Sequence, residues 1–249
     1  MYYFGLYHWR ERSRSLLLAL CGLALAAVLR RSPVRGARFL GLFVALGSVD
    51  RASRPLSKLL RPAPWTLERY KYDALVAELP LEGASTVLDV GCGTGRSLVG
   101  LAPRIPDGCT VVGLDVFDDR VILGNAPLLA RRNAREAGVD VTPVKGDAAR
   151  MPVATDTQDV VTACRVLHDL PAEDVGPALR EAHRVCAPGG TLGVLELPIV
   201  PDGVDDPEAY WRSRVAEAGF SVERTKEVER PGGDEPYVLV VAEPSPSGW

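Results

Sequence analysis

A glycine-rich segment with an acidic residue just before it carries the most specific chemistry in the chain. Asp89 stands two residues before Gly91, and Gly93 and Gly95 follow in the run VLDVGCGTG. Glycines directly after a strand let the backbone turn tightly and approach a ligand with no Cβ atom in between. A carboxylate at this point would repel a pyrophosphate but would attract a cationic amine. The segment therefore predicts a site for a small, cationic ligand.

The spacing of these glycines excludes two common nucleotide sites. A dinucleotide fingerprint of the form G-x-G-x-x-G needs glycine at position 96, where this chain has Arg96. A Walker A loop needs Gly-Lys followed by Ser or Thr, and the segment has no such sequence.

Two more acidic residues follow predicted strands. Asp115 comes twenty residues after Gly95, and Asp147 stands in the Gly146-Asp147-Ala148 segment after the third predicted strand. A carboxylate after the second strand can accept hydrogen bonds from both hydroxyls of a ribose, and one after the third would lie near an adenine amino group. Any one of these acids is also typical of a helix cap. Three in order favour a cationic, adenosine-bearing ligand.

Strand and helix patterns alternate from about residue 67 onward, which predicts a parallel, doubly wound α/β sheet. The loop between the last two strands is too short for a crossover helix, so one of them is expected to run antiparallel. The predicted strands are 86–90, 110–116, 141–144, 160–163, 191–197, 221–228 and 237–242, and the predicted helices are 70–79, 97–101, 127–137, 178–185 and 210–218.

Residues 70–243 resemble the class I S-adenosylmethionine-dependent methyltransferases, and within them the branch that methylates ubiquinone and menaquinone precursors on carbon. The resemblance rests on four blocks in the right order: VLDVGCGTG, GLDV, GDAARMPVATDTQDVV and LREAHRVCAPGGTLGVLEL. It implies a Rossmann-like, doubly wound sheet of seven strands with one antiparallel strand near the C-terminus, and the fold is expected to be preceded by a hydrophobic, helical N-terminal segment.

The resemblance also implies a site for S-adenosylmethionine, the methyl donor. Asp89 and the three glycines would line the methionine part, Asp115 would bind the ribose, Val116 would pack on the adenine, and Asp147 would hold its amino group. Cys164 and Arg165 would flank the methyl group. The implied site residues are Asp89, Gly91, Gly93, Gly95, Asp115, Val116, Asp147, Ala148 and Cys164.

Methyl transfer depends mainly on positioning and desolvation, so a general base is optional. His168 in CRVLHDLP titrates near neutral pH and could deprotonate a hydroxyl or an activated carbon acid, with Arg165 and Asp169 beside it. It could equally be a helix-start residue that packs on the sheet. Tyr70 and Tyr72 could cap the donor or pack as helix residues. No catalytic residue is assigned from the sequence, and no metal site is visible in it.

The segment from Phe117 to Pro127 is longer than the usual connection after the second strand. Its acidic and basic residues could fold over the adenine or gate the acceptor, and a plain surface loop is the alternative.

Charge divides the chain into two parts. Residues 1–62 hold eleven basic and two acidic residues, whereas the remainder holds 18 basic and 30 acidic ones. The first part contains two apolar runs, 15–29 and 39–49, flanked by arginines. Residues 50–66 contain three prolines and are predicted to be a linker. We therefore expect a membrane-associating segment with its linker in residues 1–62, and a methyltransferase domain in 63–249.

Three structures are compatible with the apolar runs. The first run, at 15 residues, extends only about 22 Å as a helix against a hydrocarbon core of ~30 Å. It could be one short span, part of a helical hairpin, or a soluble helical extension. A cleaved signal peptide is disfavoured because Arg30 and Arg31 stand where small residues precede a cleavage site.

The functional expectation is a methyltransferase attached to a membrane, with its domain facing the cytoplasm where S-adenosylmethionine is made. The acceptor would be a small, lipophilic molecule such as a quinone precursor, a lipid or an isoprenoid. Nucleic acid is an unfavourable partner because the domain is acidic. Two alternatives stay open: a non-catalytic, membrane-anchored protein that binds S-adenosylmethionine, and a nicotinamide-dependent oxidoreductase.

Overall fold

The computed structural model describes residues 1–60, 63–232 and 235–245, and they divide into two compact units. The sheet unit comprises Met1–Tyr2, Leu67–Phe117 and the chain from Ala126 on; the hairpin unit comprises Tyr3–Thr66 and Asp118–Asn125. The division after Thr66 lies close to the boundary expected after residue 62.

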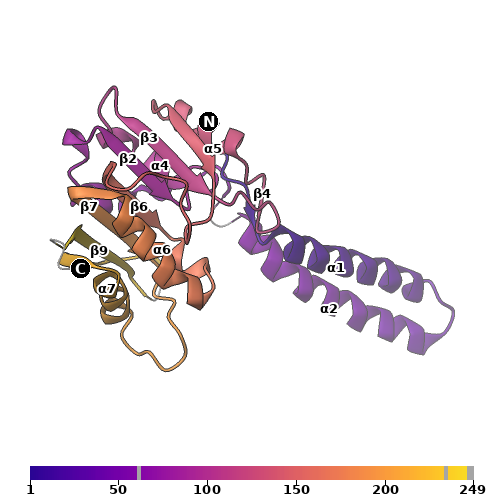
Figure 1. Ribbon diagram of the computed structural model, residues 1–249. Coiled ribbons are helices and arrows are strands. Elements are labelled where there is room, and N and C mark those ends of the chain that lie inside the picture. The colour runs from indigo at the N-terminus through magenta and orange to yellow at the C-terminus, as the bar shows by residue number, and fades with distance from the viewer. Residues whose placement is uncertain (61–62, 233–234, 246–249) are drawn as a thin grey trace. The chain divides into compact units, whose positions relative to one another are not determined.

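Seven strands form the sheet of the sheet unit in the order β5-β3-β2-β6-β7-β9-β8 (Figure 1). All run parallel except β9, which is antiparallel to both of its neighbours. The predicted seven-stranded sheet with one antiparallel strand near the C-terminus is confirmed. The strands are β2 (Thr86–Val90), β3 (Thr110–Asp115), β5 (Val141–Lys145), β6 (Gln158–Cys164), β7 (Cys186–Glu196), β8 (Phe220–Val228) and β9 (Tyr237–Pro244).

Helices cover both faces of this sheet, so its central strands read as almost continuous apolar runs instead of alternating ones. Val87 and Leu88 are adjacent in β2 and fully buried, and they belong to the cores on opposite faces. One core includes side chains of α3 (Arg69–Val76), α4 (Arg96–Leu101) and α5 (Pro127–Glu136). The other includes α6 (Ala172–Val185) and α7 (Pro207–Glu217).

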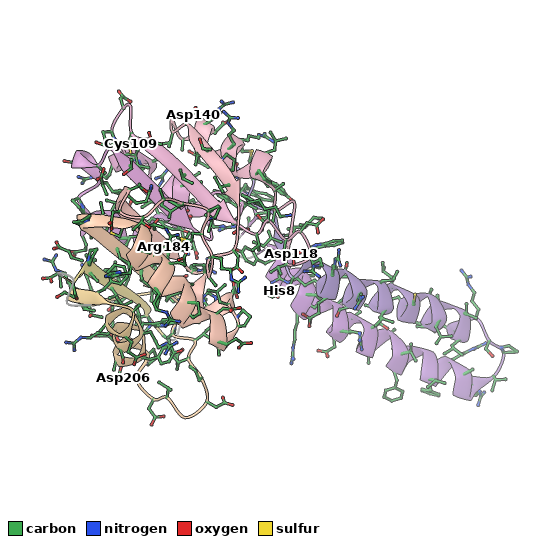
Figure 2. All side chains as sticks on the ribbon, viewed as in Figure 1. His8, Cys109, Asp118, Asp140, Arg184 and Asp206 are labelled. Carbon is green, nitrogen blue, oxygen red and sulfur yellow. The ribbon has the colours of Figure 1, made fainter. Side chains whose placement is uncertain are left out.

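Two polar contacts hold the helices of the second face in place (Figure 2). Arg184 on α6 donates to the carbonyls of Met151 and Val153, which fixes α6 to the segment after β5. Asp206 caps α7 by accepting a hydrogen bond of 2.9 Å from the amide of Ala209. This interaction satisfies one of the amides left unpaired at the start of a helix.

The hairpin unit consists of two long antiparallel helices and a small sheet. Helix α1 (Trp9–Arg30) packs along α2 (Arg35–Leu60). Residues 50–60, predicted to be part of a linker, are helical, and α2 continues through Pro55. Proline inside a helix costs roughly 3 kcal/mol, and packing along α1 offsets this cost. Among the described residues, α1 alone is long and apolar enough to cross a membrane by length and composition.

The long connection after β3 belongs to the hairpin unit. Its strand β4 (Ile122–Leu123) pairs antiparallel with β1 (Leu6–Tyr7), and the indole of Trp9 donates to the carbonyl of Asp119 at 2.8 Å. Residues 118–125 thus form a clasp with the segment that leads into α1. The clasp gives these residues a packing partner, and a role in covering the adenine or gating the acceptor stays a prediction.

Gly5 gives a test of the clasp. It has a φ of +71°, and a Cβ atom there would lie 2.5 Å from the carbonyl oxygen of Leu123. Gly108 has a similar φ of +83° but no heavy atom within 4 Å of such a Cβ. We expect Gly5→Ala to open the clasp and to speed hydrogen exchange of the amides in 118–125, whereas Gly108→Ala, which carries the same backbone strain of about 1 kcal/mol, leaves it unchanged. Equal exchange in the two variants would contradict the clasp.

Candidate active site

The three predicted acids and the glycine loop lie at the carboxyl ends of neighbouring strands. Strand β2 leads into the loop and lies between β3 and β6. The sheet continues from β3 to β5 on one side and from β6 to β7 on the other, so the strand order reverses at β2. This reversal of strand order is the place where open α/β sheets bind ligands. The segment after β5 joins the same edge, because Gly146 donates to the carbonyl of Asp115.

Asp115 ties the glycine loop to the turn after β3. One of its carboxylate oxygens accepts from the amide of Gly93 at 2.9 Å, and the other accepts from the amide of Phe117 at 2.6 Å. Phe117 has a positive φ of 52°, which is rare for a bulky residue. The carboxylate therefore fixes the backbone on both sides of the place where a ribose is expected.

Gly93 lines an open cradle. Its φ is +52°, and a Cβ atom there would meet only the Asp115 carboxylate and the carbonyl of Gly91, both at 3.9 Å. A side chain at position 93 would occupy the space over the loop, whereas glycine leaves this space open to a ligand. A backbone cradle with a carboxylate beside it suits the hydroxyls and cationic groups of S-adenosylmethionine, so the residues present fit this molecule.

Gly91 is close-packed instead. A Cβ atom there would lie 2.2 Å from a methyl group of Val166, in the segment after β6. The missing side chain lets that segment pack directly on the glycine loop. The contact brings the residues after β6, including His168, to the loop.

Asp89 is buried inside the sheet and not in the cradle. Ser97 on α4 donates to one of its oxygens, and Thr162 on β6 donates to the other at 2.7 Å. Burial raises the pKa of Asp89 to about 7, and the nearby negative charge of Asp115 adds to this increase. The two hydrogen bonds act in the opposite direction and lower the pKa, but by less. Its contact with a cationic amine stays a prediction.

The other predicted site residues differ in exposure. Val116 is 54 % exposed after β3, in keeping with a residue that packs on a ligand, whereas Ala148 and Cys164 are buried. The carboxylate of Asp147 accepts from the amide of Ala149 and closes a tight turn. Burial, followed by the nearby charges of Asp89 and Glu196, raises the pKa of the Cys164 thiol well above its ordinary value. Cys164 is therefore a packing residue in the thiol form.

Glu196 is a site residue that the sequence analysis missed. Its carboxylate is fully buried at the end of β7 and accepts from the amides of Val166 and Leu167 at 2.8 and 2.7 Å. Its second oxygen lies 2.5 Å from Nδ1 of His168. With Nδ1 held in this way, Nε2 is the nitrogen of His168 that can exchange a proton, and it lies 3.5 Å from Asp169.

The pKa of His168 reflects this partner. Burial lowers it, but the hydrogen bond and the charge of Glu196 raise it by more, so the net shift is upward from 6.5. The imidazolium is thus stabilised by a fixed carboxylate, as in proton-transfer pairs of other enzymes.

Lys71 is a second charged residue of this region that no pattern in the sequence singled out. Lys71 on α3 is fully buried, with its ammonium 2.6 Å from Glu68 and 3.1 Å from the hydroxyl of Tyr237. Burial raises the pKa of Glu68, but Lys71, Arg165 and Arg96 lower it by more. The positive charges of Lys71 on α3, Arg96 at the start of α4 and Arg165 after β6 therefore act on the carboxylate of Glu68.

Comparison with known proteins points to one family. Residues 87–190 match the model of a methyltransferase domain, and this part of the chain is similar to S-adenosylmethionine-dependent methyltransferases, several of them named demethylmenaquinone methyltransferases. The demethylmenaquinone methyltransferase of Thermus thermophilus is 36 % identical over 127 residues, which are 51 % of this chain and 54 % of that protein. The 27-O-demethylrifamycin SV methyltransferase of Amycolatopsis mediterranei is 32 % identical over 52 % of this chain and 44 % of that protein.

The chain thus spans about half the length of these curated relatives. Solved structures agree in fold. An S-adenosylmethionine-dependent methyltransferase from Aquifex aeolicus matches with a TM-score of 0.57 and 24 % identity, covering 75 % of this chain and 96 % of that one. The cyclase SpnF matches with a TM-score of 0.59 and 20 % identity, covering 74 % and 83 %. Because a cyclase shares the fold, the fold alone does not define the reaction.

Two glycine variants separate packing from ligand binding. Gly91→Ala is expected to lower the free energy of unfolding by roughly 2–3 kcal/mol or more, because its methyl group overlaps Val166. Gly93→Ala is expected to cost about 1 kcal/mol for its positive φ and to weaken binding of S-adenosylmethionine by filling the cradle. Denaturant unfolding and calorimetry measure the two effects. Restored stability in Gly91→Ala with Val166→Ala would confirm the overlap, and unchanged ligand affinity in Gly93→Ala would contradict the cradle.

The His168–Glu196 pair makes stability depend on pH. The pKa of His168 is higher in the folded chain than its ordinary value of 6.5, so folding is favoured by its protonation. This contribution is complete below pH 6.5 and disappears as the pH rises through the folded pKa. The stability advantage of wild type over His168→Gln should therefore shrink as the pH is raised from 6 to 9, as measured by urea unfolding. A difference that is constant over this range would contradict the pairing.

Proposed function

We propose that the chain transfers a methyl group from S-adenosylmethionine to a small, lipophilic acceptor at a membrane. One observation carries the proposal: Val166 packs against Gly91, and this contact brings the His168–Glu196 pair next to the glycine cradle. A donor site and a proton acceptor then lie at the ends of adjacent strands, β2 and β6.

The residues present suit each part of the donor. In the proposal, Asp115 holds the ribose, Val116 packs on the adenine, Asp147 accepts from its amino group, and Gly93 lies along the methionine part. When bound, S-adenosylmethionine supplies an electrophilic methyl group on a sulfonium. The cradle and Asp115 hold it in one orientation, and positioning accounts for much of the rate of such a displacement.

We assign His168 the role of proton acceptor. In an acceptor that carries a ring hydroxyl, Nε2 takes the hydroxyl proton and leaves an oxyanion. Its negative charge is shared with the adjacent ring carbon, so either the oxygen or that carbon can attack the methyl group. Glu196 stabilises the resulting imidazolium, in agreement with the raised pKa of His168. Cys164 stays protonated and shapes the wall of the site.

The acceptor class is supported by two observations. Several relatives are named demethylmenaquinone methyltransferases, and residues 1–60 include an apolar helix that is long enough for a membrane. A hydroxylated ring with an isoprenoid tail combines both properties. The domain would face the cytoplasm, because S-adenosylmethionine is made there.

Calorimetry on the full chain in detergent tests the donor site. We expect roughly micromolar binding of S-adenosylmethionine and S-adenosylhomocysteine, no binding of NAD, and at least a tenfold loss in Asp115→Ala. Asp140→Ala is the matched control, since Asp140 is exposed on the opposite edge of the sheet, at the start of β5. Binding of NAD in preference to the sulfonium pair would favour the oxidoreductase alternative.

Methyl transfer itself is measured on the same protein in lipid vesicles. We expect labelled methyl groups to enter a prenylated naphthoquinol that lacks its ring methyl group, and to enter the tail-less ring more slowly. Equal rates for the two acceptors would contradict a lipophilic acceptor. Binding of the donor without transfer to any molecule of a membrane extract would favour the non-catalytic alternative.

A further inference from the structure

The pair of helices α1 and α2 packs in the way that helices pack in lipid. Small residues form the contact: Ala19, Ala26, Gly41 and Ser48 are all buried. A Cβ atom on Gly22 would lie 2.1 Å from Ser48 Oγ, and one on Gly41 would lie 3.0 Å from the carbonyl oxygen of Ala26. Backbones approach this closely in membranes, where large apolar side chains gain nothing by facing each other.

Many large apolar side chains lie on the outside of the pair. Leu17, Leu20, Val28, Phe39 and Phe43 are between 61 and 70 % exposed. In water these residues would form the contact between the helices and the small ones would face outward. The polar group at the contact, Ser48 Oγ, donates to the carbonyl of Val44 at 2.7 Å, so it needs no water.

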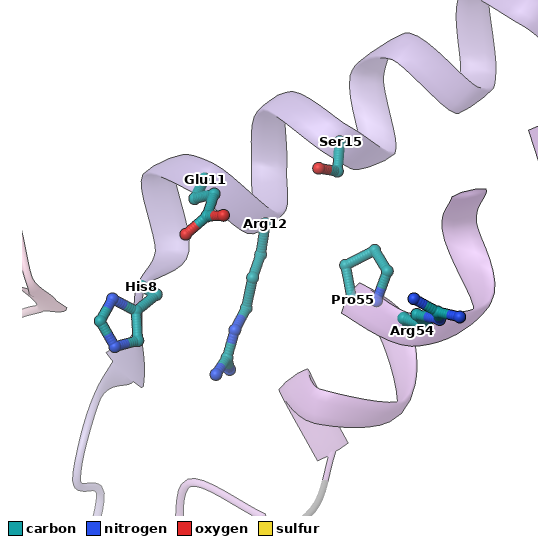
Figure 3. A pocket seen from close by; sticks show the side chains of 6 residues that line it. All are labelled: His8, Glu11, Arg12, Ser15, Arg54 and Pro55. Carbon is teal, nitrogen blue, oxygen red and sulfur yellow. The ribbon is translucent and has the colours of Figure 1, made fainter. Parts of the chain in front are cut away.

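Arginines border the apolar part of the hairpin at both ends. The tip set comprises Arg30, Arg31, Arg35 and Arg38, and the base set comprises Arg10, Arg12, Arg14, Arg51 and Arg54; Glu11 and Asp50 are the acidic residues of this region. Both sets line open pockets. At the base, a cavity of about 240 Å³ is lined by His8, Glu11, Arg12, Ser15, Arg54 and Pro55 (Figure 3).

The pocket at the tip combines charge with apolar surface. Arg30, Arg35, Arg38, Phe39 and Leu42 line a cavity of about 510 Å³. A guanidinium group binds phosphate oxygens through two parallel hydrogen bonds. Arginines next to exposed apolar side chains therefore suit the phosphate and the upper acyl chain of a lipid.

We infer that the α1–α2 hairpin crosses an anionic bilayer, with the base set at the phosphates of one leaflet and the tip set at the phosphates of the other. The inference rests on the membrane attachment in the proposed function and names the lipid partner and the topology.

Charge placement excludes the two other ways of meeting a bilayer. A hairpin that dips into one leaflet would bring four tip arginines into hydrocarbon, which is unfavourable. A helix that lies flat in the interface needs a polar face along its length, whereas residues 15–29 of α1 contain no charge on any side.

The apolar part of each helix is shorter than a hydrocarbon core of ~30 Å. Arg12 and Arg30 are 18 residues apart on α1, about 27 Å along the helix axis. The apolar part of α2 is shorter, because Arg38 and Arg51 are 13 residues apart, about 20 Å along the axis. Extended arginine side chains and local thinning of the bilayer make up such a difference.

Thiol accessibility tests the topology. Cys21 is exposed in the middle of the apolar part of α1, while Cys92, Cys164 and Cys186 are buried. In a Cys109→Ser background we would compare native Cys21 with two single probes in Cys21→Ala protein: Ser13→Cys at the base and Ser32→Cys at the tip. Each protein is expressed in bacteria and treated, in spheroplasts and in inverted vesicles, with a maleimide that cannot cross membranes.

The expected result is labelling of the base and tip probes from opposite sides, and labelling of Cys21 only after detergent is added. Labelling of base and tip from the same side would overturn the crossing. Rapid labelling of Cys21 in intact membranes would overturn insertion altogether. Binding of S-adenosylmethionine, measured on the same samples, reports separately on the proposed function.

Reconstitution into vesicles tests the lipid partner. We expect the full chain to insert preferentially into phosphatidylcholine with phosphatidylglycerol over phosphatidylcholine alone. Arg30, Arg35 and Arg38→Gln should reduce this preference roughly fivefold for each arginine removed. The matched control replaces Arg104, Arg131 and Arg212, exposed arginines of the sheet unit, and should keep the preference. Equal insertion into both vesicles, or equal loss in both triple variants, would overturn anionic recognition.

Discussion

The packing of Val166 against Gly91 is the contact on which the geometry of the site depends. With no Cβ atom at Gly91, the segment after β6 rests directly on the glycine loop after β2. Glu196 then fixes this segment from its other side, through the amides of Val166 and Leu167 and through the ring of His168. One missing methyl group thus sets where His168 stands relative to the glycine loop.

The two units follow opposite packing rules, which is what the membrane insertion proposed for the hairpin unit requires. In the sheet unit, large apolar side chains such as Trp211 and Tyr72 are buried between helices and sheet, as water requires. In the hairpin unit, small residues lie at the helix contact and large ones face outward. A single chain with both patterns is consistent with chemistry that takes a polar donor from water and an apolar acceptor from lipid.

Much of the sheet unit could be predicted from the sequence, because each central strand is a short, β-branched run bounded by glycine, proline or acidic residues. The prediction for β2 matches residue for residue, and those for β3 and β5 differ by one residue at an end. The place of Asp115 at the end of the second predicted strand also agrees with the structure, whereas its hydrogen bond from Gly93 is visible only there. Such features are local in sequence or follow from parallel topology.

The features that escaped prediction depend on contacts between distant segments. Glu196 reads as an ordinary acid at the end of a strand, and its role arises only when β7 pairs with β6. The clasp uses two-residue strands, which are too short for any periodicity to show. Pro55 signalled a break, but packing of α2 along α1 outweighs the loss of one backbone hydrogen bond.

Asp89 is a motif residue whose partners within the protein are visible only in the structure. The acid in VLDVGCGTG is predicted to face a cationic ligand, and in the structure it accepts hydrogen bonds from Ser97 and Thr162. These partners lie on α4 and on β6, the two elements that flank the loop. Asp89 therefore links the start of the helix to the neighbouring strand beneath the loop. Its raised pKa, about 7, follows from the burial that this bridging role demands, so the acid supports the cradle from beneath while Asp115 borders it.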